Sequence, residues 1–270
     1  MNRFLTCFFL LALLPFLAQA QTTVTAAEIL AKINKGEAVS YQNATITGNL
    51  DLTKLQNMAL KPDKPGTNTY NSKEFISTVT APISFKNCTF TGNVLAYFNP
   101  DNLRDKSLTE TGKSLNEVYN TVFNKEVRFE KCVFTAEAAF KYAEFKDQVS
   151  FAGSSFKKEA LFKYTKFSQS TDFSNTAFEG MAIFKYTKFP QEALFQNAVF
   201  RQEASFKYAH FPQGADFSTA QFSGLADFKY ANFAGKTDWQ GTAFHAGRDI
   251  KYTKMKDSPF KDAARKEKVR

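Results

Sequence analysis

The chain is poor in several residue types on which enzymes and metal sites commonly depend. Its 270 residues include 2 His, 3 Cys and 1 Trp. So few histidines leave little room for a histidine-based metal site or a conventional nucleophile–base pair. The 12 Gly and 8 Pro exclude collagen-like and low-complexity chains. Beyond the first twenty residues, no apolar run approaches the length of a membrane-spanning helix.

Phenylalanine, in contrast, is abundant, with 31 copies. The hydrophobic content of 43% and the charged content of 23% are those of an ordinary folded chain. A core that accepts the same large ring so many times indicates a repetitive architecture rather than an ordinary enzyme.

The first twenty residues have the features of a secretory signal. A positive start, Met1-Asn2-Arg3, precedes an apolar run over 4–17 and the small residues of Ala18-Gln19-Ala20. We therefore predict a signal peptide over 1–20, cleaved after Ala20, and export to the periplasm or the cell exterior. Lipidation of Cys7 is the alternative, but Cys7 lies at the beginning of the apolar run rather than at its end.

The strongest signal is an internal repeat, in which large apolar residues follow one another in alternating steps of five and six. An amphipathic helix would need steps of three and four. The series is Phe129, Phe134, Phe140, Phe145, Phe151, Phe156, Phe162, Phe167, Phe173, Phe178, Phe184, Phe189, Phe195, Phe200, Phe206, Phe211, Phe217, Phe222, Phe228, Phe233, Trp239, Phe244, Ile250 and Met255.

A small residue stands two positions before nearly every large one, as Ala182 does before Phe184. Because strand side chains alternate between two faces, the small residue and the ring point inward together. This unit resembles that of the pentapeptide-repeat family, which reads roughly Ala-(Asp/Asn)-Leu-x-x; here Phe replaces Leu, and every second unit has one extra residue. The middle Asp/Asn slot is filled by Asp172, Asp216, Asp227 and Asp238.

The resemblance implies an all-β solenoid: a right-handed, quadrilateral parallel β-helix with one unit on each side. Four units amount to 22 residues per coil, and we expect the extra residues at corners. A three-sided β-helix is the structural alternative, but four rings per turn favour four sides.

The register extends into the N-terminal half, where Tyr41, Phe85 and Phe129 are separated by 44 residues. We interpret each interval as one coil plus an insertion, because Pro, Gly, Asn and Asp interrupt the pattern there. The predicted parts are an N-terminal capping region over 21–38 with a helix over 26–35, first coils over 39–128 with insertions over about 54–78 and 97–122, a regular β-helix over 129–257, and a basic C-terminal helix or tail over 258–270.

One predicted side repeats a Lys-Tyr pair at strict 22-residue spacing. The six pairs are Lys141-Tyr142, Lys163-Tyr164, Lys185-Tyr186, Lys207-Tyr208, Lys229-Tyr230 and Lys251-Tyr252. The six five-residue segments that contain them carry nine Lys and one Glu. We expect both columns at outward positions of stacked strands about 4.8 Å apart. Like charges stacked in this way are unfavourable unless something offsets the repulsion.

The functional interpretation is a basic, aromatic stripe for an elongated anionic partner, which could be an anionic glycan, a membrane surface or the acidic face of a protein. Aromatic rings also stack on sugars and bases. Two alternatives remain open: the rings stiffen the solenoid while the ammonium groups face solvent, or copying of a 22-residue unit preserved the pair without any binding role.

The two cysteines outside the signal sequence, Cys88 and Cys132, fall in one inward column of small residues. We expect them to be stacked neighbours, close enough for a disulfide, which export would permit. The alternative that we favour is a buried pair of thiols, because side chains at stacked parallel positions often point poorly toward each other.

No motif indicates catalysis, a cofactor or a metal site. His210 takes a position that is Lys in sister coils, and His245 lies in a charged surface stretch. We therefore expect an exported, non-enzymatic scaffold or binding module, for which an end-to-end homodimer is one option. DNA mimicry that inhibits a topoisomerase, known in the family, would need an acidic surface and a cytoplasmic location. We do not expect DNA itself as a partner. A carbohydrate-active β-helix enzyme would need a cleft of converging side chains.

Overall fold

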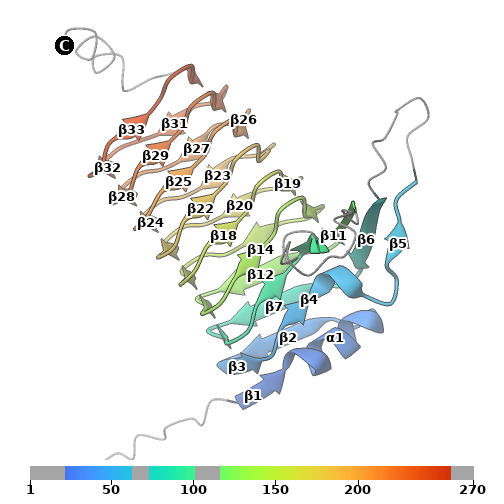
Figure 1. Ribbon diagram of the computed structural model, residues 1–270. Helices are drawn as coiled ribbons and strands as arrows, with labels where there is room; N and C mark the ends of the chain where they lie inside the picture. The colour runs from blue at the N-terminus through green and yellow to red at the C-terminus, as the bar shows by residue number, and fades with distance from the viewer. Residues whose placement is uncertain (1–21, 63–72, 101–115, 257–270) are drawn as a thin grey trace, which may run out of the picture.

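The computed structural model describes residues 22–62, 73–100 and 116–256, which form a stack of coils with a short helix at its N-terminal end (Figure 1). Strands from successive coils pair in parallel and build four sheets, here named A to D. The predicted signal peptide over 1–20 and the predicted C-terminal helix over 258–270 lie outside the described residues.

Three of the sheets run along the whole described stack. Sheet A contains β1 (Thr22–Thr25), β3 (Ala44–Thr47), β8 (Thr89–Phe90), β13 (Val133–Phe134), β17 (Ser155–Phe156), β21 (Ala177–Phe178), β24 (Val199–Phe200), β28 (Gln221–Phe222) and β32 (Ala243–Phe244). Sheet B contains β2 (Val39–Gln42), β7 (Ile83–Lys86), β12 (Val127–Glu130), β16 (Val149–Ser150), β20 (Thr171–Asp172), β23 (Ala193–Leu194), β27 (Ala215–Asp216) and β31 (Thr237–Asp238). Sheet C contains β4 (Leu50–Asp51), β9 (Val94–Leu95), β14 (Ala138–Ala139), β18 (Ala160–Leu161), β22 (Ala182–Ile183), β25 (Ala204–Ser205), β29 (Ala226–Asp227) and β33 (Arg248–Asp249).

Sheet D forms the fourth side and is less regular. It contains β5 (Ala59–Leu60), β6 (Lys73–Val79), β11 (Glu117–Phe123), β15 (Glu144–Phe145) and β19 (Lys166–Phe167), and then β26 (His210–Phe211), β30 (Asn232–Phe233) and β34 (Lys254–Met255). Single bridges from Lys166 to Lys188 and from Lys188 to His210 join its two parts. Strand β10 (Tyr97–Phe98) pairs with β11 in antiparallel orientation.

The pairing register equals the predicted repeat. Phe134 pairs with Phe156, and Phe156 pairs with Phe178, each 22 residues further along the chain. Tyr41 pairs directly with Phe85, and Phe85 with Phe129, so each of these 44-residue intervals is one coil that contains an insertion. Four sheets around one core confirm the four-sided parallel β-helix over the three-sided alternative.

Stacked phenylalanine rings fill the core. Phe156 lies parallel to Phe178 with ring centroids 5.2 Å apart, and Phe178 lies 4.9 Å from Phe200. Rings from different sides meet edge to face, as Phe162 and Phe173 do at 5.1 Å and 82°. Both arrangements suit the aromatic quadrupole. Small polar residues fit between the rings because their hydroxyls find partners: Thr165 donates to the carbonyl of Phe140 at 2.7 Å.

Helix α1 (Ala26–Asn34) covers the N-terminal end of the core. Its capping box is formed by Thr25 and Glu28: the Glu28 backbone N–H donates to Thr25 Oγ1 at 3.2 Å, and the Thr25 N–H donates to Glu28 Oε2 at 2.8 Å. Ile29 and Ile33 are buried beneath the helix, and the helix packs against β2 and β4. The capping helix therefore shields the first coil from solvent.

The two insertions end earlier than predicted. We expected them over 54–78 and 97–122, but β6 begins at Lys73 and β11 at Glu117, and these strands pair in parallel over seven residues each. Strand β6 keeps the alternation of the repeat but has Val79 where the repeat has Phe, so the phenylalanine pattern did not reveal it. Ser77 and Val79 take the inward positions that Thr121 and Phe123 take in β11. The N-terminal halves of both strands run beyond the coil and pair with β5 and β10.

Phe184 offers a test of the packed core. Its ring is fully buried and lies 5.0 Å from Phe162 and 4.9 Å from Phe206. We expect Phe184→Ala to lower the free energy of unfolding by about 3–5 kcal/mol through the cavity that it leaves. Phe184→Leu, which restores the family residue, should cost about half as much. Urea unfolding followed by circular dichroism measures both, and a loss below about 1 kcal/mol for the alanine variant would contradict a close-packed core.

Candidate functional site

The Lys-Tyr pairs lie at the corner between sheets C and D, not within a strand as we predicted. In each coil the backbone turns over four residues, and the Ala143 N–H donates to the Phe140 carbonyl at 3.0 Å. The same bond recurs in the other five coils at 2.8–3.1 Å. Lys and Tyr occupy the two central positions of this turn. The corner, rather than a flat side, therefore carries both columns, which are called the Lys-Tyr ladder below.

Every tyrosine of the ladder adopts a left-handed backbone conformation. The φ angles are 58° at Tyr142, 61° at Tyr164, 61° at Tyr186, 59° at Tyr208, 61° at Tyr230 and 61° at Tyr252. Only the second central residue has positive φ, which is the geometry of a type II turn. The diagonally opposite corner has positive φ at Asn43, Asn87, Lys131, Gly153, Asn175, Asn197, Thr219 and Gly241. Most of these residues are Asn or Gly, which tolerate positive φ, whereas the Lys-Tyr ladder has Tyr at every such position.

Stability alone does not explain tyrosine at these positions. A left-handed conformation costs a residue with a Cβ about 1–2 kcal/mol. The rings recover part of this cost by stacking, because Tyr164, Tyr186 and Tyr208 have successive centroid distances of 4.7 Å and such pairs contribute about 0.5–1.5 kcal/mol. The two effects are of similar size. Asparagine or glycine would form the same turn without the strain.

The stacking closes the faces of the inner rings. Tyr164 is nearly parallel to Tyr142 on one side and to Tyr186 on the other, at 4.9 and 4.7 Å. Tyr186, Tyr208 and Tyr230 are sandwiched in the same way. The expectation that these rings stack on sugars or bases is therefore wrong for the inner rings. They present ring edges and hydroxyl groups instead.

The ladder lysines lie beside the tyrosine column. Each ammonium group is 5.1–5.8 Å from the centroid of the following tyrosine ring. Burial lowers the pKa of Lys163, and the neighbouring charges of Lys141 and Lys185 lower it further. Among the described residues no ladder lysine forms an ion pair. The column is thus a row of positive charges that repel one another and have no carboxylate partner in the described ranges.

Sequence reasoning missed one member of this site, Tyr97 in β10. Lys141 Nζ donates to the Tyr97 hydroxyl at 2.9 Å and lies 4.4 Å from the centroid of its ring. The Tyr97 ring also lies 5.9 Å from that of Tyr142. It therefore closes the N-terminal end of the ladder. Its position 44 residues before Lys141, the interval of one coil with an insertion, could have revealed it.

The aspartates in the middle slot of the repeat serve the turns. Asp172 accepts from the Ser174 N–H at 2.7 Å, and Asp216 accepts from the Ser218 N–H at 2.8 Å. Asp227 and Asp238 accept in the same way from the N–H two residues further on. These are the local bonds by which Asp favours turns. The carboxylates therefore have a structural explanation.

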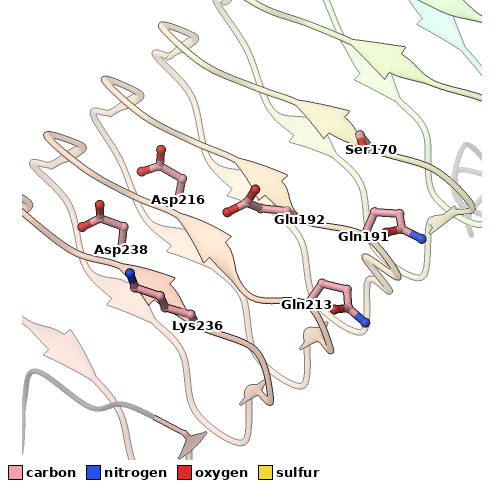
Figure 2. Close-up of a pocket in the computed structure, with 7 residues that line it drawn as sticks. All are labelled: Ser170, Gln191, Glu192, Gln213, Asp216, Lys236 and Asp238. Atoms are coloured by element: carbon pink, nitrogen blue, oxygen red, sulfur yellow. The ribbon is translucent and has the colours of Figure 1, made fainter.

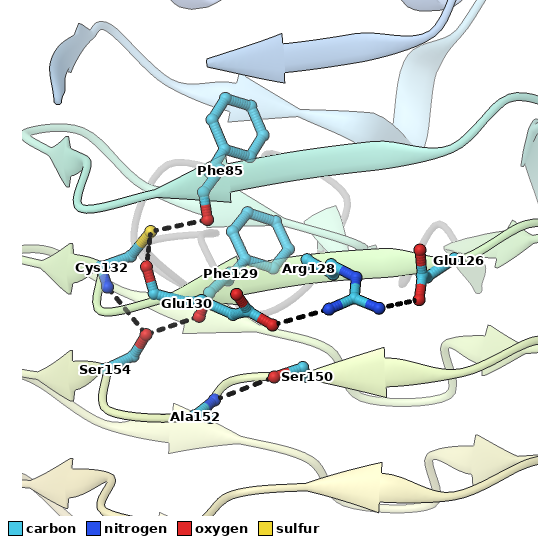
Figure 3. A network of polar contacts seen from close by, with 9 residues as sticks. All are labelled: Phe85, Glu126, Arg128, Phe129, Glu130, Cys132, Ser150, Ala152 and Ser154. Carbon is cyan, nitrogen blue, oxygen red and sulfur yellow. Dashed lines mark hydrogen bonds and ion pairs between the residues drawn. The ribbon is translucent and has the colours of Figure 1, made fainter. Parts of the chain in front are cut away.

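Cys88 and Cys132 are buried free thiols at equivalent positions of adjacent coils. Figure 3 shows Cys132 with the Phe85 and Glu130 carbonyls, each 3.4 Å from its sulfur, and with Ser154, whose Oγ accepts from the Cys132 N–H at 2.9 Å. The neighbouring Cys88 thiol and burial both raise the pKa of Cys132. Both effects disfavour the thiolate of Cys132, whereas the neighbouring Cys132 thiol lowers the pKa of Cys88 to about 7. Both residues are fully buried, so the pair occupies the core as small residues do.

A shallow groove of about 560 Å³ lies at the corner between sheets D and B (Figure 2). Its lining includes Glu192, Asp216 and Asp238 against a single cation, Lys236. This groove would repel an anionic polymer. His210 is exposed on sheet D, and Nε2 of the exposed His245 lies 3.3 Å from Gln221 Oε1.

The fold places this chain among the repeat proteins whose five-residue units form a four-sided parallel β-solenoid. A family model described as pentapeptide repeats (9 copies) matches residues 119–166, 162–210 and 184–232. Residues 119–232 of the chain are therefore pentapeptide repeats, and proteins of that family are generally structural or binding proteins rather than enzymes. No curated protein and no solved structure matches the chain.

Two further features bear on the site. Within the described ranges, no group of three or more His, Cys, Asp or Glu residues is placed to hold a metal ion. None of the helices in that part of the chain is long and apolar enough to span a membrane.

Tyr186 offers a test of what holds the ladder together. In Tyr186→Asn the turn strain is relieved while two stacking contacts are lost, so we expect the free energy of unfolding to change by no more than about 1 kcal/mol. The matched variant Tyr186→Ala loses the contacts and keeps the strain, and it should be the less stable of the two. Thermal and urea unfolding measure both. A loss above about 2 kcal/mol in the asparagine variant would show that stacking dominates.

The cysteine pair can be tested by alkylation. Because Cys88 and Cys132 are 1% and 0% exposed, we expect neither thiol to react with a maleimide in the folded protein and both to react in denaturant without reductant. Peptide mass spectrometry identifies the labelled residues. Labelling of these two residues that requires a reductant would instead show that they are joined in a disulfide. Cys88→Ala and Cys132→Ala serve as controls, since Ala fills the equivalent column position at Ala198 and Ala220.

Proposed function

We propose that the mature chain is an exported, non-enzymatic scaffold that binds an anionic partner through the Lys-Tyr ladder. Export rests on the signal-like features of residues 1–20. The observation that carries the binding proposal is the row of ammonium groups, none of which forms an ion pair within the part of the chain that the structure describes. Within this row, burial and the neighbouring Lys141 and Lys185 lower the pKa of Lys163. An anionic partner would relieve this repulsion along the whole row.

The tyrosines support the same proposal. Each ladder phenol ring has an ammonium group 5.1–5.8 Å from its centroid, and the phenol hydroxyl can donate a hydrogen bond to an anionic oxygen. Because the turn itself would be formed more easily by asparagine or glycine, the phenol column is better explained by contact with a partner than by the backbone. The regular spacing of 4.7–4.9 Å between rings makes the site extended and repetitive.

The proposal is tested with a variant in which Lys163, Lys185 and Lys207 are replaced by Ser. We expect binding to polygalacturonate or to vesicles that contain phosphatidylglycerol to weaken about tenfold or more at low salt. The matched control replaces the exposed Lys125, Lys158 and Lys236, which removes the same charge elsewhere and should change binding little. Equal losses in both variants would indicate a non-specific charge effect, and no loss in either would exclude the ladder.

The pH dependence provides a second readout of the same site. Because the pKa of Lys163 is lowered in the free protein, this member of the ladder loses its charge at a lower pH than an ordinary lysine does. Binding of an anion requires the protonated form and should raise this pKa, so affinity should fall as pH rises through the alkaline range. The fall should begin at a lower pH for the unmodified protein than for the variant without Lys163, Lys185 and Lys207. Titration by fluorescence anisotropy or co-sedimentation measures it, and identical profiles would count against the ladder.

A further inference from the structure

The positive charge extends from the ladder onto the C-terminal part of sheet D, where no carboxylate interrupts it. In the last five coils, the segments 162–168, 184–190, 206–212, 228–234 and 250–256 contain nine Lys and no Asp or Glu. Lys166, Lys188, His210 and Lys254 of this set are exposed on the outer side of sheet D. These segments are called the basic face below. It includes the ladder from Lys163 onward.

The basic face is flat along the stack. Its strands are in register from Lys166 through Lys188 and His210 to Asn232 and Lys254, and the phenylalanine rings behind them repeat at 4.6–5.1 Å. Five coils at about 4.8 Å give a height of roughly 19 Å from the first strand to the last. In Figure 1 the labelled strands β19 and β26 of this side lie along one edge of the stack.

The surroundings of this face restrict which anion it suits. The groove between sheets D and B is lined by Glu192, Asp216 and Asp238, so a flexible polymer that left the face on that side would meet carboxylates. The inner tyrosine rings have no free face for a sugar or a base. A planar anionic surface, in contrast, touches only the flat side and the ridge beside it.

We propose that the basic face docks on a phospholipid bilayer that contains anionic headgroups, an inference that rests on the ladder function proposed above. Lysines would contact headgroup phosphates, and each lysine near an anionic leaflet adds to the attraction. The tyrosine ridge would lie at the level of the headgroups, where amphipathic phenols are favoured. The protein would then be a peripheral membrane scaffold whose basic face contacts the bilayer.

The test compares vesicles of phosphatidylcholine with and without phosphatidylglycerol, using the mature chain at low and high salt. We expect co-sedimentation only with the anionic vesicles, and its loss at high salt because exposed charges are screened. Inorganic phosphate at millimolar concentration should not compete, because it offers one anion where the membrane offers many.

A variant of sheet D separates the membrane from a linear polymer. Replacing Lys166, Lys188 and Lys254 by Ser leaves the ladder intact, and we expect about tenfold or greater loss of vesicle binding with less than about threefold change for polygalacturonate. The Lys125, Lys158 and Lys236 variant is the matched control, and unchanged circular dichroism shows that both variants fold. Lys188→Ser alone provides a milder version should the triple variant fail to fold.

The outcomes separate the two proposals. Binding of polygalacturonate through the ladder without binding of anionic vesicles would overturn the membrane inference and leave the proposed function standing. Equal binding to neutral and anionic vesicles, or wild-type vesicle binding by the sheet D variant, would also overturn it. Failure to bind either probe would overturn both proposals.

Discussion

The in-register stacking of one coil on the next is the constraint on which the rest of this structure depends. Each inward ring can lie parallel to the ring above it only if every circuit returns after 22 residues, as Phe178 does beneath Phe200. Because the rings interlock edge to face around the core, as Phe173 does with Phe184, the four sides cannot slip independently. A change of one residue in a circuit would move its rings to the solvent side.

The same constraint turns surface residues into columns. A side chain on one coil has its counterpart about one strand spacing away on the next, so a lysine that is harmless alone becomes a row of repelling charges. Lys141, Lys163 and Lys185 illustrate this effect. The solenoid thus converts a short local motif into an extended surface property, and a repetitive partner or surface is the natural complement of such a row.

The two diagonally opposite corners show how local strain and function can be distinguished. Both need positive φ at one position per coil, and one corner meets this need mainly with Asn and Gly, such as Asn175 and Gly241, while the other uses Tyr throughout, as at Tyr186. The backbone requirement is the same, so the difference lies in the side chains. The tyrosines are held by their neighbours above and below, and their hydroxyl edges are the part left for contact.

Much of this arrangement could be predicted from the sequence, because the repeat is a local pattern. The alternation of five and six residues and the small residue before each ring determined the coil length, the inward positions and the family, and the capping box of Thr25 and Glu28 determined the N-terminal helix. The 22-residue spacing also determined that Tyr164, Tyr186 and Tyr208 would form one column.

The tertiary structure decided what the columns can do. It placed Lys and Tyr at a corner, closed the faces of the inner rings, added Tyr97 to the end of the ladder and joined sheet D to it as one flat basic side. It also showed that β6 resumes the coil before the phenylalanine series does, since Val79 takes the ring position there. These features depend on backbone angles at the turns and on distances between coils. Neither quantity can be derived from the spacing of residues along the chain.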